Sequence, residues 1–232
     1  MHNSLNKKIV SFLDVMSTTD EYYATESDKL YLRKYNACDD YNLPKSLIDK
    51  TWNELSKKFN ALNPITLEVN PVSILHTNAG TGKVLADCPS DNVMITALNN
   101  DYVCKTISDY INQSARVNNS YKSDISDISH FFINGDNGNT RKYDIVFTQP
   151  TNLRYYRGVD GTDLNTKMPL EYYSMRSLAF LTKGGYLCVF THPRMFKALT
   201  ENASFTNKAH LVAKIYNSAK FDEYGCLIFK SK

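Results

Sequence analysis

Two stretches of the sequence combine the pattern of a buried strand with residues that can contact a ligand at close range. The first, residues 74–82, is an apolar run that breaks into a loop containing Gly80 and Gly82. The second, residues 143–150, is an apolar run that ends at Gln149 and Pro150. Glycine allows the backbone to approach a ligand closely, and open α/β sheets bind ligands at the carboxyl ends of their strands. We therefore expect the two turns to face each other across one site.

The glycine loop does not fit a nucleoside triphosphatase. A Walker loop requires a glycine five residues before Gly82, where Thr77 stands. It also requires Ser or Thr after the lysine, and Lys83 is followed by Val84. Without that hydroxyl group the loop has no ligand for magnesium.

The pattern after Pro71 alternates between strand and helix, which predicts βαβ units and a largely parallel sheet. Residues 118–129 are polar and read as a surface excursion or an irregular helix. The last two strands have no helix between them, so we expect an antiparallel closing hairpin. Strands are expected near 72–77, 93–98, 130–134, 143–148, 185–191, 210–216 and 224–230, and helices near 82–87, 101–115 and 169–182.

Before Pro71, apolar residues at helical spacing predict helices over 3–16 and 45–60. We expect these helices to cover one side of the sheet, with Trp52 packed in the core. The predicted organisation is an N-terminal helical cap over 1–70 and one compact α/β domain over 71–232.

Composition is that of a soluble globular protein, with 42% hydrophobic and 22% charged residues. No apolar run approaches the roughly 18 residues of a membrane span, and the N-terminus does not read as a signal peptide. Five cysteines without Cys-x-x-Cys spacing favour reduced thiols in the cytoplasm and argue against a metal site. The net charge is +3, and 12 Lys/Arg against 6 Asp/Glu from residue 151 onward weakly indicate a nucleic-acid partner.

From about residue 72 to residue 230, the order of segments resembles the adenine-specific (N6), S-adenosylmethionine-dependent DNA methyltransferases. Residues 76–82 (HTNAGTG) stand where that family has Asp-Pro-Ser-Ala-Gly-Thr-Gly. Residues 149–152 (QPTN) stand at its Asp/Asn-Pro-Pro-Tyr/Phe signature. Residues 178–187 resemble its helix, Gly-Gly turn and fifth strand, and 221–229 resemble its closing hairpin.

The resemblance implies a Rossmann-like methyltransferase domain with a mostly parallel seven-stranded sheet, and S-adenosylmethionine as cofactor. Asn99 takes the place of the acidic residue that holds the cofactor ribose, and Asp136 matches the aspartate near the cofactor adenine. The implied cofactor-binding residues are His76, Asn78, Gly80, Gly82, Asn99 and Asp136.

The resemblance also assigns the acceptor residues. Gln149 and the backbone carbonyl of Pro150 would accept hydrogen bonds from the target amine. Gln149 places its amide oxygen about 1.5 Å further out than asparagine would, and a shift of this size can lower the rate about a hundredfold. Asn152 stands at the base-stacking position and cannot stack. Tyr155 or Tyr156, flanked by Arg154 and Arg157, would then supply a stacking face and a phosphate grip.

The departures from the motifs leave three functions open. The first is methyl transfer to the N6 amine of adenine in DNA. The second is a catalytically degenerate, methyltransferase-like module that binds nucleic acid or a partner protein. The third is methylation of RNA or of a protein glutamine. The chain has no segment resembling a large target-recognition domain, so selectivity would be slight or supplied by a protein partner. An enzyme of this kind would suit a phage or mobile element.

Overall fold

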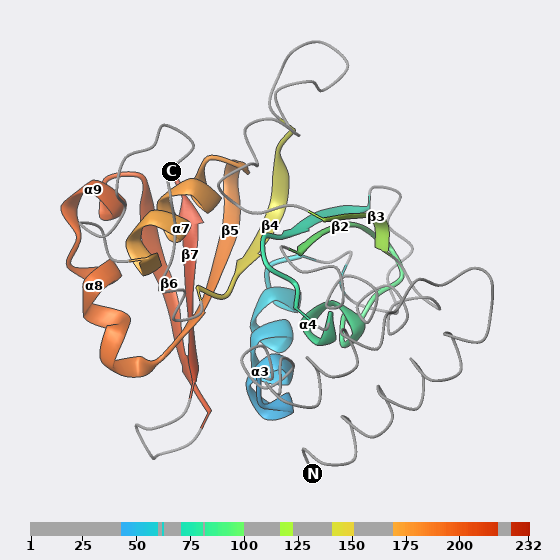
Figure 1. Ribbon diagram of the computed structural model, residues 1–232, viewed down its shortest axis with the longest axis horizontal. Coiled ribbons are helices and arrows are strands. Elements are labelled where there is room, and N and C mark those ends of the chain that lie inside the picture. Colours follow the sequence, from blue (N-terminus) through green and yellow to red (C-terminus); the bar gives the residue numbers. More distant parts are fainter. Residues whose placement is uncertain are drawn as a thin grey trace, which may run out of the picture.

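The computed structural model describes residues 43–59, 62, 71–80, 82–99, 117–122, 141–150, 169–217 and 224–232. Their centre is a seven-stranded sheet in the order β3-β2-β1-β4-β5-β7-β6 (Figure 1). Strand β7 runs antiparallel to its neighbours β5 and β6, and the other strand pairs are parallel. The strands are β1 (Val72–His76), β2 (Val93–Asn99), β3 (Val117–Lys122), β4 (Tyr143–Thr148), β5 (Leu181–Thr191), β6 (Ala209–Tyr216) and β7 (Gly225–Ser231). The predicted α/β fold with a closing hairpin is therefore confirmed.

The strand order reverses between β1 and β4. From β1 the chain proceeds outward through β2 and β3, and from β4 it proceeds outward in the opposite direction through β5. The parallel register pairs Ile74 with Ile145 and His76 with Phe147. The carboxyl ends of β1 and β4 therefore meet at a topological switch point, the place where open α/β sheets bind ligands.

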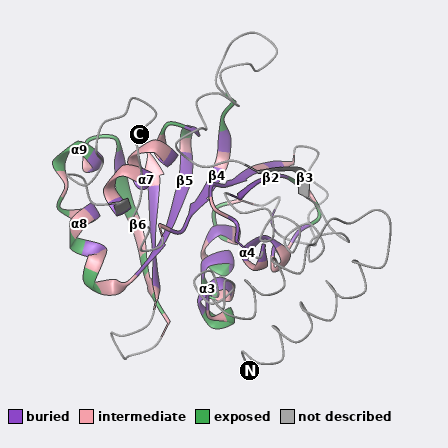
Figure 2. Ribbon diagram, in the orientation of Figure 1, coloured by how far each residue is buried: buried purple, intermediate pink, exposed green. Residues whose placement is uncertain are grey.

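Helices pack on both faces of this sheet (Figure 1). One buried cluster joins α3 (Lys45–Ser56) and α4 (Lys83–Ala86) to β1, β2 and β4. The other joins α7 (Pro169–Leu178), η4 (Pro193–Met195), α8 (Phe196–Thr200) and α9 (Ala203–Thr206) to the opposite face. Figure 2 shows buried residues concentrated along β4, β5 and β7, so the sheet is covered on both sides at its centre.

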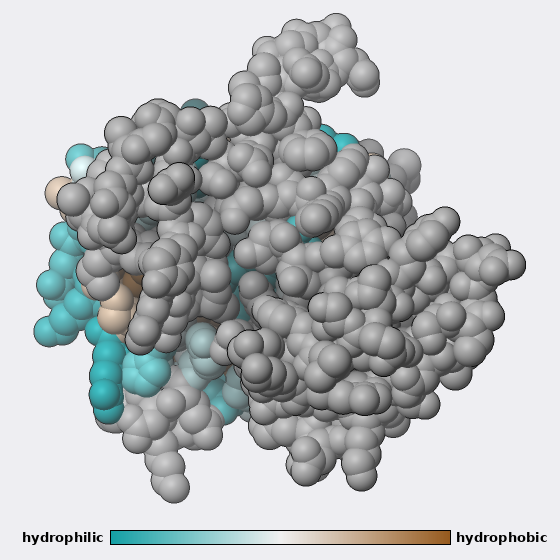
Figure 3. Space-filling model, viewed as in Figure 1, coloured by the Kyte–Doolittle hydropathy of each residue, from teal (hydrophilic) through white to brown (hydrophobic). Residues whose placement is uncertain are grey.

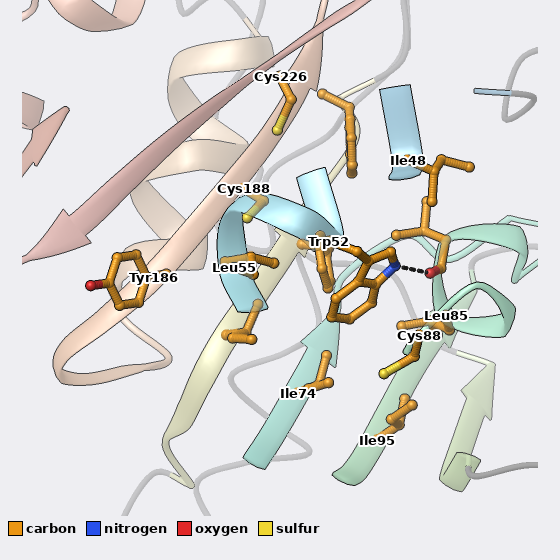
Figure 4. Packing of buried hydrophobic residues seen from close by; sticks show 14 of the residues in the cluster. Ile48, Trp52, Leu55, Ile74, Leu85, Cys88, Ile95, Tyr186, Cys188 and Cys226 are labelled. Atoms are coloured by element: carbon orange, nitrogen blue, oxygen red, sulfur yellow. Dashed lines mark hydrogen bonds between the residues drawn. The ribbon is translucent and has the colours of Figure 1, made fainter. Parts of the chain in front are cut away.

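Helix α3 begins after Pro44, whose fixed φ suits a helix start, and buries an apolar stripe at helical spacing. Trp52 in that stripe is 3% exposed and donates from Nε1 to the carbonyl oxygen of Val84, 2.8 Å away (Figure 4). Its ring meets Phe147 edge-on, with centroids 5.0 Å apart. The prediction that Trp52 is a core residue is confirmed.

Several expected boundaries were wrong. Residues 117–122 form the edge strand β3 on β2, whereas a surface excursion or an irregular helix was expected over 118–129. Backbone hydrogen bonds make an edge ladder, so a polar sequence without apolar alternation still pairs. Helix α7 ends at Leu178 and β5 begins at Leu181, four residues earlier than expected. The expected helices over 3–16 and 101–115 and the expected strand over 130–134 lie outside the described residues.

Within the described part of the chain, no helix has the length and apolar character to cross a membrane. The three described cysteines, Cys88, Cys188 and Cys226, are buried, and none forms a disulfide with another described residue.

Candidate active site

The turn after β1 is tied to both neighbouring strands. The Thr77 N–H donates to the carbonyl oxygen of Phe147 in β4 at 3.0 Å. Two residues later, the Ala79 N–H donates to the carbonyl oxygen of Leu98 in β2 at 2.8 Å. The first residues of the predicted ligand loop are thus held between β2 and β4.

The two glycines of this loop adopt conformations that other residues rarely take. Gly80 has φ of 55° and Gly82 has φ of 75°, both in the left-handed region. The carbonyl oxygen of Gly82 accepts from the N–H groups of Leu85 and Ala86 at 3.1 and 3.0 Å, which starts α4. The loop therefore turns from strand to helix through two positions that favour glycine.

The side chain of Asn78 bridges the turn after β1 to the turn after β4. Its Oδ1 accepts from the Gln149 N–H at 2.8 Å, and its Nδ2 donates to the Gln149 carbonyl oxygen. Both bonds go to one residue, so the Asn78 amide fixes the peptide groups on either side of the Gln149 Cα. We refer to this pair of bonds as the Asn78–Gln149 bridge.

Two threonine hydroxyls, which the sequence did not single out, support this bridge. The Thr77 hydroxyl donates to Thr148 Oγ1 at 3.0 Å, and Thr77 Oγ1 lies 3.3 Å from Asn78 Oδ1. Thr148 is fully buried. No local sequence signal identifies this contact, because its two partners are 71 residues apart.

His76 is buried and uncharged at the end of β1. His76 is 1% exposed, and neither ring nitrogen has a hydrogen-bond partner among the described residues. Burial lowers the pKa of His76 to about 3, because the charged imidazolium would lose its hydration. The ring contacts Phe147 edge-on, with centroids 5.8 Å apart. Its predicted role in cofactor binding stays a prediction.

Asn99 ends the neighbouring strand β2 and is also buried, with 2% of its surface exposed. Within the described part of the chain, its Nδ2 has no hydrogen-bond partner. A buried donor without a partner costs on the order of 1–3 kcal/mol, so such groups are rare in folded proteins. The amide of Asn99 is a group that a polar ligand could satisfy.

The structure brings together the predicted site residues that it describes. Gly80 and Pro150 follow adjacent parallel strands at one edge of the sheet, as expected. Gln149 is 1% exposed, so its side chain lies inside the protein. The other predicted site residues, Asp136, Asn152, Arg154, Tyr155, Tyr156 and Arg157, lie outside the described residues.

No family model matches this sequence. No curated protein matches it either.

Solved structures, in contrast, resemble the whole fold. A magnesium protoporphyrin IX methyltransferase from Synechocystis with bound S-adenosylmethionine superimposes with a TM-score of 0.57 at 10% identity, covering 91% of this chain and all of that one. An rRNA methylase from Streptococcus thermophilus gives 0.53 at 8% identity, covering 80% and 96%. A proposed methyltransferase of Streptococcus mutans in complex with S-adenosylhomocysteine gives 0.51 at 10% identity, covering 80% and 98%. The chain therefore has the Rossmann-like fold of the S-adenosylmethionine-dependent methyltransferases.

Proposed function

We propose that this protein transfers a methyl group from S-adenosylmethionine to the exocyclic amine of adenine in a nucleic acid, with DNA as the preferred substrate. One observation carries the proposal: the glycine loop after β1 and the Gln149–Pro150 turn after β4 are joined at the switch point of the sheet. A donor held by the first turn would lie beside an acceptor held by the second. The bound cofactor of the Synechocystis enzyme and the rRNA substrate class of the Streptococcus thermophilus enzyme support the proposal at the level of the fold.

The residues at the ends of β1 and β2 fit this cofactor. Gly80 and Gly82 give the loop a close backbone approach. The unpartnered Nδ2 of Asn99 is a donor that a ribose hydroxyl oxygen would satisfy. When bound, S-adenosylmethionine supplies an electrophilic methyl group on a sulfonium.

The turn after β4 supplies the acceptor side. The target amine must present a lone pair that is not delocalised into the purine ring. Two oxygen acceptors on its hydrogens favour that form and share the positive charge that develops on nitrogen. The Gln149 amide oxygen and the Pro150 carbonyl oxygen are the assigned acceptors. The backbone of Gln149 is already fixed by Asn78.

An excess of basic residues in the C-terminal part of the described chain supports a polyanionic substrate. The described residues from η4 to Lys232 contain six basic residues, Arg194, Lys197, Lys208, Lys214, Lys230 and Lys232, against one acidic residue, Glu201. Figure 3 shows hydrophilic side chains along the side of the molecule formed by α8 and α9. Phosphate neutralisation by such residues gives affinity that falls with salt.

Calorimetry with S-adenosylmethionine, followed by transfer of a labelled methyl group to adenine-containing DNA and RNA, tests the proposal. Gln149→Ala should abolish transfer while leaving cofactor affinity unchanged. Lys183→Ala, at an exposed position in β5, is the matched control and should behave as wild type. If the protein does not bind S-adenosylmethionine at millimolar concentration, the proposed enzymatic function is excluded.

A second candidate is a non-catalytic module that binds nucleic acid or a partner protein. The uncharged His76 and Asn99 favour it, because the resembled family has acidic residues at these positions. Loss of a charge-assisted bond at Asn99 weakens the hold on a ribose by about 1 kcal/mol. This candidate predicts salt-dependent nucleic-acid binding with no affinity for S-adenosylmethionine.

A further inference from the structure

We propose that Asn78 is a positioning residue of the reaction, which holds the backbone of Gln149 so that the acceptor turn keeps a fixed relation to the cofactor loop. This inference rests on the proposed function. It differs from the role that the sequence suggested for Asn78, because the bonds of its side chain go to the acceptor turn.

The geometry of the bridge constrains one residue from both sides. The Gln149 N–H lies in the peptide group before its Cα, and the Gln149 carbonyl lies in the peptide group after it. Asn78 accepts from the first at 2.8 Å and donates to the second. Both Gln149 backbone dihedrals are therefore restrained, which sets the direction in which the Gln149 side chain and Pro150 leave the sheet.

The bridge takes over where backbone pairing between β1 and β4 stops. The last backbone bond between them runs from the Thr77 N–H to the carbonyl oxygen of Phe147. At the next residue the chain turns away, and the Asn78 side chain offers the acceptor and donor that a further strand residue would have offered. Since Ala79 is bonded to Leu98, the same short segment is held by β2. A movement of the cofactor loop would therefore also move the backbone of Gln149, because the Asn78 side-chain amide connects the two.

Hydrogen exchange and kinetics together test this role. In Asn78→Ala, we expect the Gln149 amide to exchange about tenfold faster, because its acceptor is lost. We expect kcat to fall by about tenfold to a hundredfold, because the acceptor oxygens are misplaced. The Kd for S-adenosylmethionine should stay within about threefold of wild type, since the glycine loop keeps its bonds to β2 and β4.

Asn202→Ala is the matched control. Asn202 also accepts a backbone N–H through its side chain, from Phe205 at 3.1 Å, but it caps α9 far along the chain from the site. Its removal should lower stability without changing kcat or the exchange of Gln149. Unchanged kcat in Asn78→Ala, or a loss of cofactor affinity as large as the loss of kcat, would overturn the positioning role.

Asn78→Asp keeps the test decisive if the alanine variant does not fold. Aspartate retains the oxygen that accepts from the Gln149 N–H, so exchange of that amide should stay within about threefold of wild type while kcat still falls. Fast exchange in the aspartate variant would contradict the assigned acceptor. If the wild-type protein binds no S-adenosylmethionine, the proposed function is wrong. The Asn78–Gln149 bridge is then tested by the hydrogen-exchange rates alone.

Discussion

The two ends of the β1–β4 pairing are both closed by side chains, yet they differ in how completely their polar groups are satisfied. At the amino end, the Ser73 hydroxyl donates to Asp144 Oδ2 at 2.7 Å and accepts from the Asp144 N–H at 3.1 Å. The Ser73 N–H donates to the same oxygen at 2.9 Å, and Thr182 donates to Oδ1 at 3.3 Å. Each of these groups has a partner within the protein.

At the carboxyl end, the Asn78–Gln149 bridge is satisfied, but buried groups beside it are not. Both His76 nitrogens and Asn99 Nδ2 lack hydrogen-bond partners in the part of the protein that the structure describes. Folded proteins satisfy nearly all buried polar groups, and the exceptions concentrate at functional sites. This contrast is what we expect if the amino end serves stability and the carboxyl end, as proposed above, holds a ligand.

The largest effect is expected at the amino end. Asp144→Ala removes the acceptor of the Ser73 N–H and of two hydroxyls, and should lower the free energy of unfolding by about 3 kcal/mol. Urea denaturation measures this loss. Asp49→Ala is the control, because its ion pair with Lys45 is exposed to solvent and screened, so its loss should change the free energy of unfolding far less. Equal effects of the two substitutions would contradict the structural role of the amino end.

The burial of His76 makes stability depend on pH. Its pKa is about 3 in the folded protein, against 6.5 for an unperturbed histidine, so the unfolded chain binds more protons between these values. The contribution of the neutral His76 ring to the free energy of unfolding is fully present above pH 6.5 and is lost progressively as pH falls toward 3. Between pH 7 and pH 5 this decline amounts to about 2 kcal/mol.

His76→Leu removes this titration and the two unpartnered nitrogens. Between pH 7 and pH 5, the free energy of unfolding of the variant should fall by about 2 kcal/mol less than that of wild type, as measured by urea denaturation at each pH. Parallel pH profiles for the two proteins would show that His76 gains a partner or solvent in the folded state.

The smallest effect on stability is expected at Asn99. Asn99→Leu replaces a buried amide without a partner for Nδ2 by an apolar side chain of similar size, and should leave stability within about 1 kcal/mol of wild type or raise it. The same change should weaken S-adenosylmethionine binding by about fivefold, measured by calorimetry. A large loss of stability with unchanged cofactor affinity would show that Asn99 is a structural residue. It would contradict the proposed difference between the amino and carboxyl ends of the β1–β4 pairing.

Much of the fold follows from local pattern. Apolar runs located β1, β2, β4 and β7 to within about two residues, because each is a continuous buried strand. Strand β5 was misplaced because its start contains Gly184 and Gly185, which read as a turn. In the structure Gly184 has φ of 79°, and a Cβ at Gly185 would lie 3.0 Å from the carbonyl oxygen of Asp144. The glycines form an irregularity within the strand, where β4 and β5 approach closely.

The sequence by itself determined the doubly wound α/β class, the glycine loop and the turn after β4, because strand periodicity and glycine conformation are local properties. Only the tertiary structure decided that Asn78 bonds to the backbone of Gln149, that Thr77 meets Thr148, and that His76 is buried and neutral. These contacts join residues about 70 positions apart, and their partners and burial are set by the register of β1 against β4. No local pattern encodes that register.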